Sequence, residues 1–306
     1  MFKNFNVKML LLSFIFSTVV SYAQSDSTEV VQSNIQNYTP SKLLEKGKID
    51  IKFFNNLYTQ TERTDNGTKS NIKRENFFTS SLELFTGVSK SKKINLGLII
   101  VYNSNTINGE SATSVFNFKN ELGTSRSAIS SFAPSIKFAP FKSISNFSIQ
   151  SSFYIPLHKL ETNANVFLAP KSYILQNRFY YDYTFSSRKF QLFTELGTRF
   201  FFGTKSKDDS GNFNINGGYA NNSLEIAPGI FVSYFPSNKF TILTFLQHSQ
   251  LIDLGNKFSQ DYSATGVGLK YQLSKILNLE TIYSKFIRGN DIGLGQSFNL
   301  GLRAIF

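Results

Sequence analysis

Apolar and polar side chains alternate along most of this chain with the two-residue period of extended strands. In the segment 190–202, for example, Phe190, Leu192 and Leu196 alternate with Gln191 and Glu195. The pattern predicts twelve strands, at 48–58, 74–88, 94–102, 131–139, 147–157, 171–185, 190–202, 222–235, 240–251, 261–273, 279–287 and 296–306. The 33 Phe and 14 Tyr, in a chain without Trp or Cys, also favour strands over helices, so we predict an all-β fold. No stretch in this region approaches the roughly 20 apolar residues that a membrane-spanning helix needs.

The connections between the predicted strands alternate in length. Those after even-numbered strands are tight, and read SKSKK, PFKSISN, SSRK, PSNK and SKILN. Those after odd-numbered strands are mostly long, and cover 59–73, 103–130, 158–170, 203–221, 252–260 and 288–295. A soluble sandwich has no reason to place every short turn at one end, whereas a transmembrane barrel has short periplasmic turns and longer extracellular loops. We therefore predict a transmembrane up-and-down antiparallel β-barrel of about 12 strands over residues 47–306.

The start of the chain has the features of a secretory signal peptide. Lys3 and Lys8 precede an apolar core, MLLLSFIFSTVV, and Ser21-Tyr22-Ala23 is a small-x-small cleavage site. The apolar run is too short for a membrane-spanning helix. We predict a signal peptide at 1–23, followed by a polar periplasmic leader at 24–46 that is either solvated or a docking segment.

The last ten residues, SFNLGLRAIF, place Phe298, Leu300, Leu302, Ala304 and Phe306 on one face of a strand. This end resembles the C-terminal assembly signal of Gram-negative outer-membrane barrels, in which a polar residue and a glycine precede two spaced hydrophobic residues, the second a terminal aromatic. The matching residues are Asn299, Gly301, Ala304 and Phe306, of which Ala304 is smaller than the usual choice. The Ala23–Gln24 junction and the composition rich in Phe, Asn and Lys also resemble barrels from Bacteroidota.

This resemblance implies a porin-like protein of the cell outer membrane, exported through a cleaved signal peptide. The partners it implies are outer-membrane lipid, lipopolysaccharide and the barrel assembly machinery, together with small solutes.

The net charge of +12 becomes +10 once Lys3 and Lys8 are removed. The five short turns contain no Asp or Glu and hold eight basic residues: Lys90, Lys92, Lys93, Lys142, Arg188, Lys189, Lys239 and Lys275. Basic residues at this height would face anionic lipid headgroups. A nucleic-acid groove would mix aromatic residues with the basic ones, and these turns do not, so we expect no nucleic-acid partner.

The apolar faces of the strands must face lipid, so the charged faces must face inward. The inward set contains Lys48, Asp50 and Gln150, and eleven residues that we assign to the lumen lining: Lys52, Glu83, Lys137, Arg178, Asp182, Glu195, Arg199, Glu225, Lys270, Glu280 and Arg303. Seven members of this set are cationic and six are anionic. They either line a narrow aqueous passage or pair across the lumen and close it. The longest loop, 103–130, could fold inward as a constriction.

Candidate chemistry is sparse. The chain has no Cys and two His, which excludes thiolate sites and offers no metal-ligand spacing. His248 and Ser249 are adjacent, so on a strand they point to opposite faces and cannot form a nucleophile and base. His158 lies at the end of the fifth predicted strand. We predict no catalytic, cofactor or metal site.

Three classes of function remain open. A narrow channel or transporter for small hydrophilic solutes is favoured by the charged inward face. A structural or scaffold barrel of an envelope secretion or uptake complex is the alternative, and an outer-membrane lipid hydrolase with a triad from distant strands is a weaker one.

Overall fold

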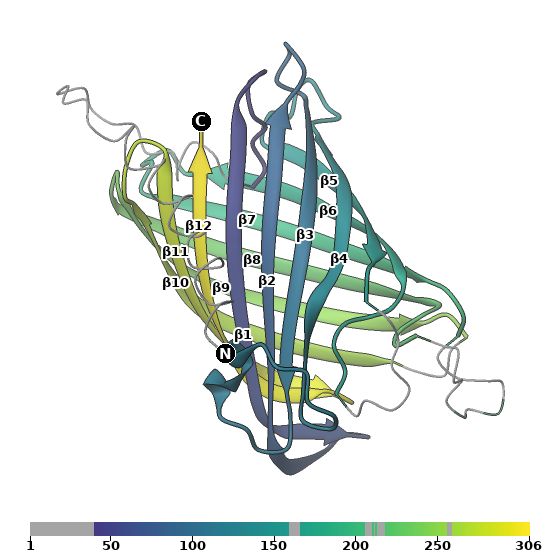
Figure 1. Ribbon diagram of the computed structural model, residues 1–306. Coiled ribbons are helices and arrows are strands. Elements are labelled where there is room, and N and C mark those ends of the chain that lie inside the picture. The colour runs from purple at the N-terminus through teal and green to yellow at the C-terminus, as the bar shows by residue number, and fades with distance from the viewer. Residues whose placement is uncertain (1–39, 159–165, 206–209, 211, 213–217, 256–258) are drawn as a thin grey trace, which may run out of the picture.

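The computed structural model describes residues 40–158, 166–205, 210, 212, 218–255 and 259–306. These residues form a closed barrel of twelve antiparallel strands (Figure 1). The predicted signal peptide and most of the predicted leader lie outside the described residues. The strands are β1 (Ile49–Asp65), β2 (Thr68–Gly87), β3 (Ile94–Thr106), β4 (Ser125–Phe138), β5 (Phe147–Pro156), β6 (Tyr173–Thr184), β7 (Phe190–Phe202), β8 (Ser223–Ser237), β9 (Phe240–Asp253), β10 (Gln260–Gln272), β11 (Leu277–Asn290) and β12 (Gly293–Ile305), with the short 3-10 helix η1 (Ala112–Asn117) between β3 and β4.

Every strand pairs with its neighbours in sequence, and β1 pairs with β12 to close the ring. Asp50 lies opposite Ile305 at this seam, and Ile49 and Phe306 exchange backbone hydrogen bonds of 3.2 and 2.9 Å. The chain ends at the rim that carries the short turns (Figure 1). All twelve predicted strands are confirmed, and the bounds of β7 agree at both ends.

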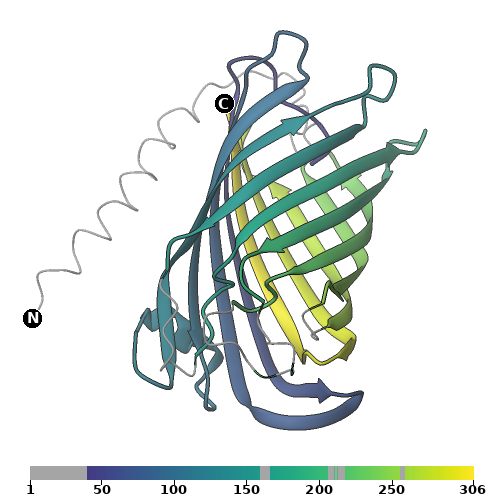
Figure 2. The same cartoon turned by 90° about the vertical axis from the view of Figure 1, so that its right-hand side faces the viewer.

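The prediction that residues 59–73 form a long loop is wrong. β1 and β2 continue through it and join at a two-residue turn, where Asn66 and Gly67 have φ angles of 49° and 76°. Positive φ at both residues is the geometry of the type I′ hairpin turn, which Asn-Gly favours. The strands here are polar on both faces, so no alternation marks them. The hairpin extends past the neighbouring part of the wall (Figure 2).

The two faces of the wall differ in chemistry. On β12, Phe298 and Leu300 face outward, while Arg303 shares the inner face with Lys52 of β1, its partner in register. The same separation holds on β10, where Val267 is 58% exposed on the outside. Large exposed apolar side chains on every side form the belt expected of a wall between lipid and water. In the described part of the chain, no helix has both the length and the apolarity to cross a membrane.

Two glycines of the inner face give a matched test of how closely the strands pack. A Cβ atom at Gly266 would overlap the Tyr283 carbonyl oxygen and the Phe245 ring, whereas one at Gly197 would meet only Ala227, at 3.5 Å. We expect Gly266→Ala to lower the free energy of unfolding by about 1–3 kcal/mol and Gly197→Ala to change it by about 0.5 kcal/mol at most. Guanidinium unfolding of the refolded barrels, followed by circular dichroism, measures both. Equal midpoints would contradict the close approach.

Candidate functional site: the barrel lumen

The inner face of the barrel encloses a cavity of about 400 Å³. Eight of the eleven residues assigned to the lumen from sequence line it: Lys52, Glu83, Lys137, Arg178, Glu195, Lys270, Glu280 and Arg303. Asp182, Arg199 and Glu225 lie on the same inner face of β6, β7 and β8 by strand register. Asp50 and Gln150 also line the cavity. Side chains alternate between the two faces of each strand, and the register of the twelve paired strands brings these residues together although they are far apart in sequence.

The charged residues pair along the wall rather than across the lumen. Arg178 of β6 and Glu195 of β7 form a bidentate pair, with N–O distances of 2.7 and 3.2 Å. Further pairs join Arg199 to Glu225 on β7 and β8, Lys270 to Glu280 on β10 and β11 at 2.8 Å, and Arg303 to Asp50 on β12 and β1 at 2.9 and 2.6 Å. Pairs between neighbouring strands neutralise the wall without bridging the interior. Of the two alternatives that the sequence left open, pairing across the lumen is not adopted by these residues.

Aromatic side chains also reach the cavity. Tyr180, Phe193, Phe231 and Phe245 form a row across β6 to β9, with successive ring centroids 5.9, 5.4 and 5.2 Å apart. Lys137 and Arg178 lie over the Tyr180 ring, 5.5 and 5.3 Å from its centroid. One side of the interior is thus partly filled by packed rings, which narrows the space left beside the charged wall.

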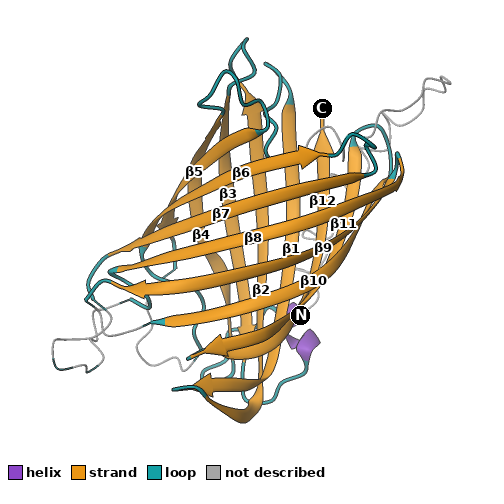
Figure 3. Cartoon of the chain, turned by 180° about the vertical axis from the view of Figure 1, so that it is seen from behind, coloured by secondary structure: helices purple, strands orange, loops and turns teal. Residues whose placement is uncertain are grey.

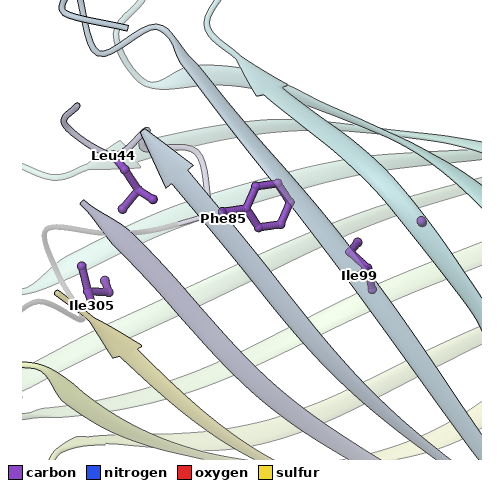
Figure 4. Close-up of a cluster of buried hydrophobic side chains, with 5 residues drawn as sticks. Leu44, Phe85, Ile99 and Ile305 are labelled. Carbon is purple, nitrogen blue, oxygen red and sulfur yellow. The ribbon is translucent and has the colours of Figure 1, made fainter. Parts of the chain in front are cut away.

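Residues 40–46 enter the periplasmic end of the lumen. Leu44 is 2% exposed and packs with Phe85, Ile99, Ala133 and Ile305 (Figure 4). We call residues 40–46 the inner plug. The sequence pattern places them in a polar leader, and the Leu43-Leu44 pair is the only signal in it that they pack inside.

Polar contacts hold the inner plug to the wall. The Leu44 amide donates to Asn95 Oδ1 at 3.2 Å, and Lys137 Nζ donates to the Lys42 carbonyl at 2.9 Å. The Ser41 hydroxyl donates to Asp182. Lys42 Nζ lies 3.8 Å from the same carboxylate. Two of the lumen residues named from sequence, Lys137 and Asp182, therefore bind the plug.

Outside the lumen, Glu45 pairs with Lys92 of the β2–β3 turn at 2.5 Å. The hydrogen bond and the charge of Lys92 lower the pKa of the Glu45 carboxyl.

Two extracellular loops occupy the other end. Asn105 on the inner face of β3 donates to the carbonyls of Phe167 and Leu168, at 2.7 and 2.9 Å. Phe167 in turn contacts Tyr219 of the β7–β8 loop, with ring centroids 5.1 Å apart. Burial raises the pKa of the Tyr219 hydroxyl to about 12. Phe167, Leu168 and Tyr219, from the described parts of these loops, thus narrow the extracellular mouth.

The predicted inward folding of loop 103–130 is wrong. β3 continues to Thr106 and β4 begins at Ser125, and the segment between them lies against the outer face of β2 and β3. Ser104, which points outward, donates to the Val115 carbonyl at 2.6 Å, and Phe116 packs edge-on against Phe78 of β2. The short helix in this segment lies outside the wall (Figure 3).

Both histidines have hydrogen-bonding partners in the wall or the loops. His248 points outward to Ser263 at 3.0 Å, while Ser249 points inward and donates to Glu225 at 3.0 Å. The two side chains lie on opposite faces, as the sequence predicted. His158 has both ring nitrogens 3.1 Å from carbonyl oxygens, of Ser130 and Ala169.

No protein-family model matches the chain, and no curated protein matches it. Among solved structures, an outer-membrane channel from Pseudomonas putida F1 is similar, with a TM-score of 0.66 at 10% identity over 92% of this chain and 100% of that one. The β domain of the Bordetella autotransporter BrkA has a TM-score of 0.52 at 10% identity, over 84% of this chain and 98% of the domain. These similarities show that the chain has the fold of a closed antiparallel β-barrel like those of the outer-membrane proteins it resembles.

Removing one member of an inner-face ion pair should leave a partly buried charge without its partner. We expect Glu195→Gln to lower the free energy of unfolding by about 1–3 kcal/mol, because Arg178 loses a bidentate acceptor. Asp65→Asn, which breaks the exposed Arg63–Asp65 pair at the hairpin tip, should cost well under about 1 kcal/mol. Guanidinium unfolding tests both variants, and an equal loss in the two would argue against the wall pairing.

Proposed function

We propose that the protein is an outer-membrane channel that passes small hydrophilic solutes. The observation that carries this proposal is the charged inner wall, whose ion pairs run between neighbouring strands and leave a cavity of about 400 Å³. A cavity of that size is at the small end of the range for small-molecule sites. An apolar outer belt and a closed ring of strands support the membrane location. The fold similarity to a channel from P. putida is consistent with it.

The wall is nearly neutral, because its cations and carboxylates are almost equal in number and four of each are paired. A passage lined in this way repels neither anions nor cations strongly, so we infer weak charge selectivity. Polar, uncharged or zwitterionic solutes fit such a lining.

The inner plug closes the periplasmic end of the lumen. Gly47 follows the plug with a φ of 86°, and no atom lies within 4 Å of an added Cβ. Passage requires the plug to leave the lumen, and Gly47 is a suitable pivot because its positive φ favours glycine. The plug is held by one apolar side chain, a few hydrogen bonds and the ion pairs of Lys42 with Asp182 and of Glu45 with Lys92. We assign channel opening to its release.

Export and assembly are inferred from the sequence. The signal peptide at 1–23 would be cleaved before Gln24, and Asn299, Gly301 and Phe306 would be read by the barrel assembly machinery. The composition and the Ala23–Gln24 junction support a Bacteroidota-like origin. Lipopolysaccharide and outer-membrane lipid are the expected surroundings.

Planar-bilayer recordings test the channel and its plug together. We expect the protein that begins at Gln24 to give rare single-channel steps, and a variant lacking residues 24–44 to conduct more often, because the periplasmic end is no longer filled. The matched control lacks only residues 24–38 and keeps the plug, so its conductance should equal that of the parent. Silence from all three proteins would contradict the channel and favour the scaffold function.

The Glu45–Lys92 pair predicts how opening depends on pH. Folding lowers the pKa of Glu45 from its ordinary value of 4.5. The Glu45–Lys92 pair therefore stabilises the bound plug above pH 4.5. This stabilisation is lost as the pH falls through the lowered pKa of Glu45. We expect openings to become more frequent when the periplasmic chamber is acidified below about pH 4.5, the ordinary carboxyl pKa.

The control is Glu45→Gln, which should open more often at neutral pH and lose this part of the pH response. An identical pH response in the parent and in Glu45→Gln would show that the pair does not latch the plug.

A further inference from the structure

The segment between β3 and β4, residues 107–124, forms a flap on the outside of the barrel. Asn76 of β2 points outward and donates through Nδ2 to the carbonyls of Glu110 and Ser111, both at 3.1 Å. Val115 of the flap is fully buried, and Phe118 packs edge-on against Tyr102 of β3, with ring centroids 5.6 Å apart. The outer flap is therefore a packed part of the wall and is held by its own hydrogen bonds.

The outer flap covers a polar strip of the wall and exposes aromatic and aliphatic side chains there, beside the exposed Lys119–Glu121 ion pair. Asn76, Ser104 and Thr106 point outward and would face the membrane side of the barrel if the flap were absent. Each of them bonds within or beneath the flap. The flap itself exposes Phe116 and Phe118, which are 46% and 51% exposed, and Leu122 beyond them.

The height of the flap on the wall follows from β3. Ile94 lies at the periplasmic rim, and Tyr102 is eight residues further along the strand. At about 3.4 Å per residue and a tilt of up to about 45°, Tyr102 lies about 20–27 Å above Ile94. An apolar belt is about 25 Å tall, so Phe118 is placed at its outer edge. Leu96 and Leu98, below the flap on the same face, are exposed parts of this belt.

Aromatic side chains at the edge of the belt suit the boundary between acyl chains and headgroups. The exposed rings are continuous with the lipid-facing leucines below them, and the polar groups behind them are already bonded. We propose that the outer flap binds lipid of the outer leaflet, with Phe116 and Phe118 inserted at the acyl-chain boundary. This proposal rests on the membrane location of the barrel and is independent of whether the lumen conducts.

Tryptophan fluorescence tests the insertion directly, because the chain contains no Trp. Phe118→Trp and Phe116→Trp are made separately, refolded into phosphatidylcholine vesicles, and compared in vesicles whose acyl chains are brominated near the headgroup. Leu98→Trp is the control for a side chain inside the belt, and Thr68→Trp, at the tip of the β1–β2 hairpin, is the control for water.

We expect both flap probes to show blue-shifted emission, to lose fluorescence in the brominated vesicles and to resist quenching by acrylamide. Leu98→Trp should respond to the brominated lipid and Thr68→Trp to acrylamide alone. Heat-modifiable gel migration confirms that each variant has folded.

Two results would overturn the proposal. Flap probes that behave like Thr68→Trp would place the rings in water. Flap probes shielded from both quenchers would show that protein covers them, which would favour a second copy or another partner. Failure of the conductance test leaves this result unaffected, so the two proposals fail separately.

Discussion

The whole structure depends on the need of each backbone N–H and C=O group for a partner in a medium without water. Within hydrocarbon an unpaired strand edge is costly, and a closed ring removes both edges. The hydrogen bonds between Ile49 and Phe306, and the register from Asp50 to Ile305, are where this chain meets that requirement. Because β1 and β12 pair antiparallel at this seam, the strand count is even and both ends of the barrel lie at one rim. The closed wall also gives each strand a lipid face and an inner face.

The inner face solves a second problem, which is how to keep many charges in a confined space. Each pair, such as Arg178 with Glu195 or Arg303 with Asp50, joins adjacent strands and lies along the wall instead of crossing the lumen. The interior is then narrowed by other elements: the ring row from Tyr180 to Phe245, the inner plug, and the loops around Phe167 and Tyr219. The paired charges thus stay on the wall, and separate chain segments fill the space at the two ends of the lumen.

The loops take opposite directions because of the side chains that receive them. Asn105 points inward and holds the loop after β5 in the lumen, while Asn76 points outward and holds the flap on the wall. The two asparagines lie at nearly the same height on neighbouring strands, since Asn76 pairs with Thr106 and Asn105 with Phe77, and they differ in the face to which they point. A loop's length therefore says little about whether it constricts a pore.

The sequence by itself determined the strands, their faces and the residues of the inner wall, because a period of two is a local property of each strand and each strand pairs with the next along the chain. Alternation alone is enough to assign Glu195, Arg303 and their neighbours to the inner face. Alternation fails to predict the extracellular extensions of β1 and β2, because both faces of these strands carry polar side chains and the sequence has no period of two there. Only the tertiary structure decided where the plug, the flap and the inward loops lie. Their contacts, such as Leu44 with Ile305 or Asn105 with Phe167, join residues far apart in sequence, and irregular segments carry no period from which such contacts could be read.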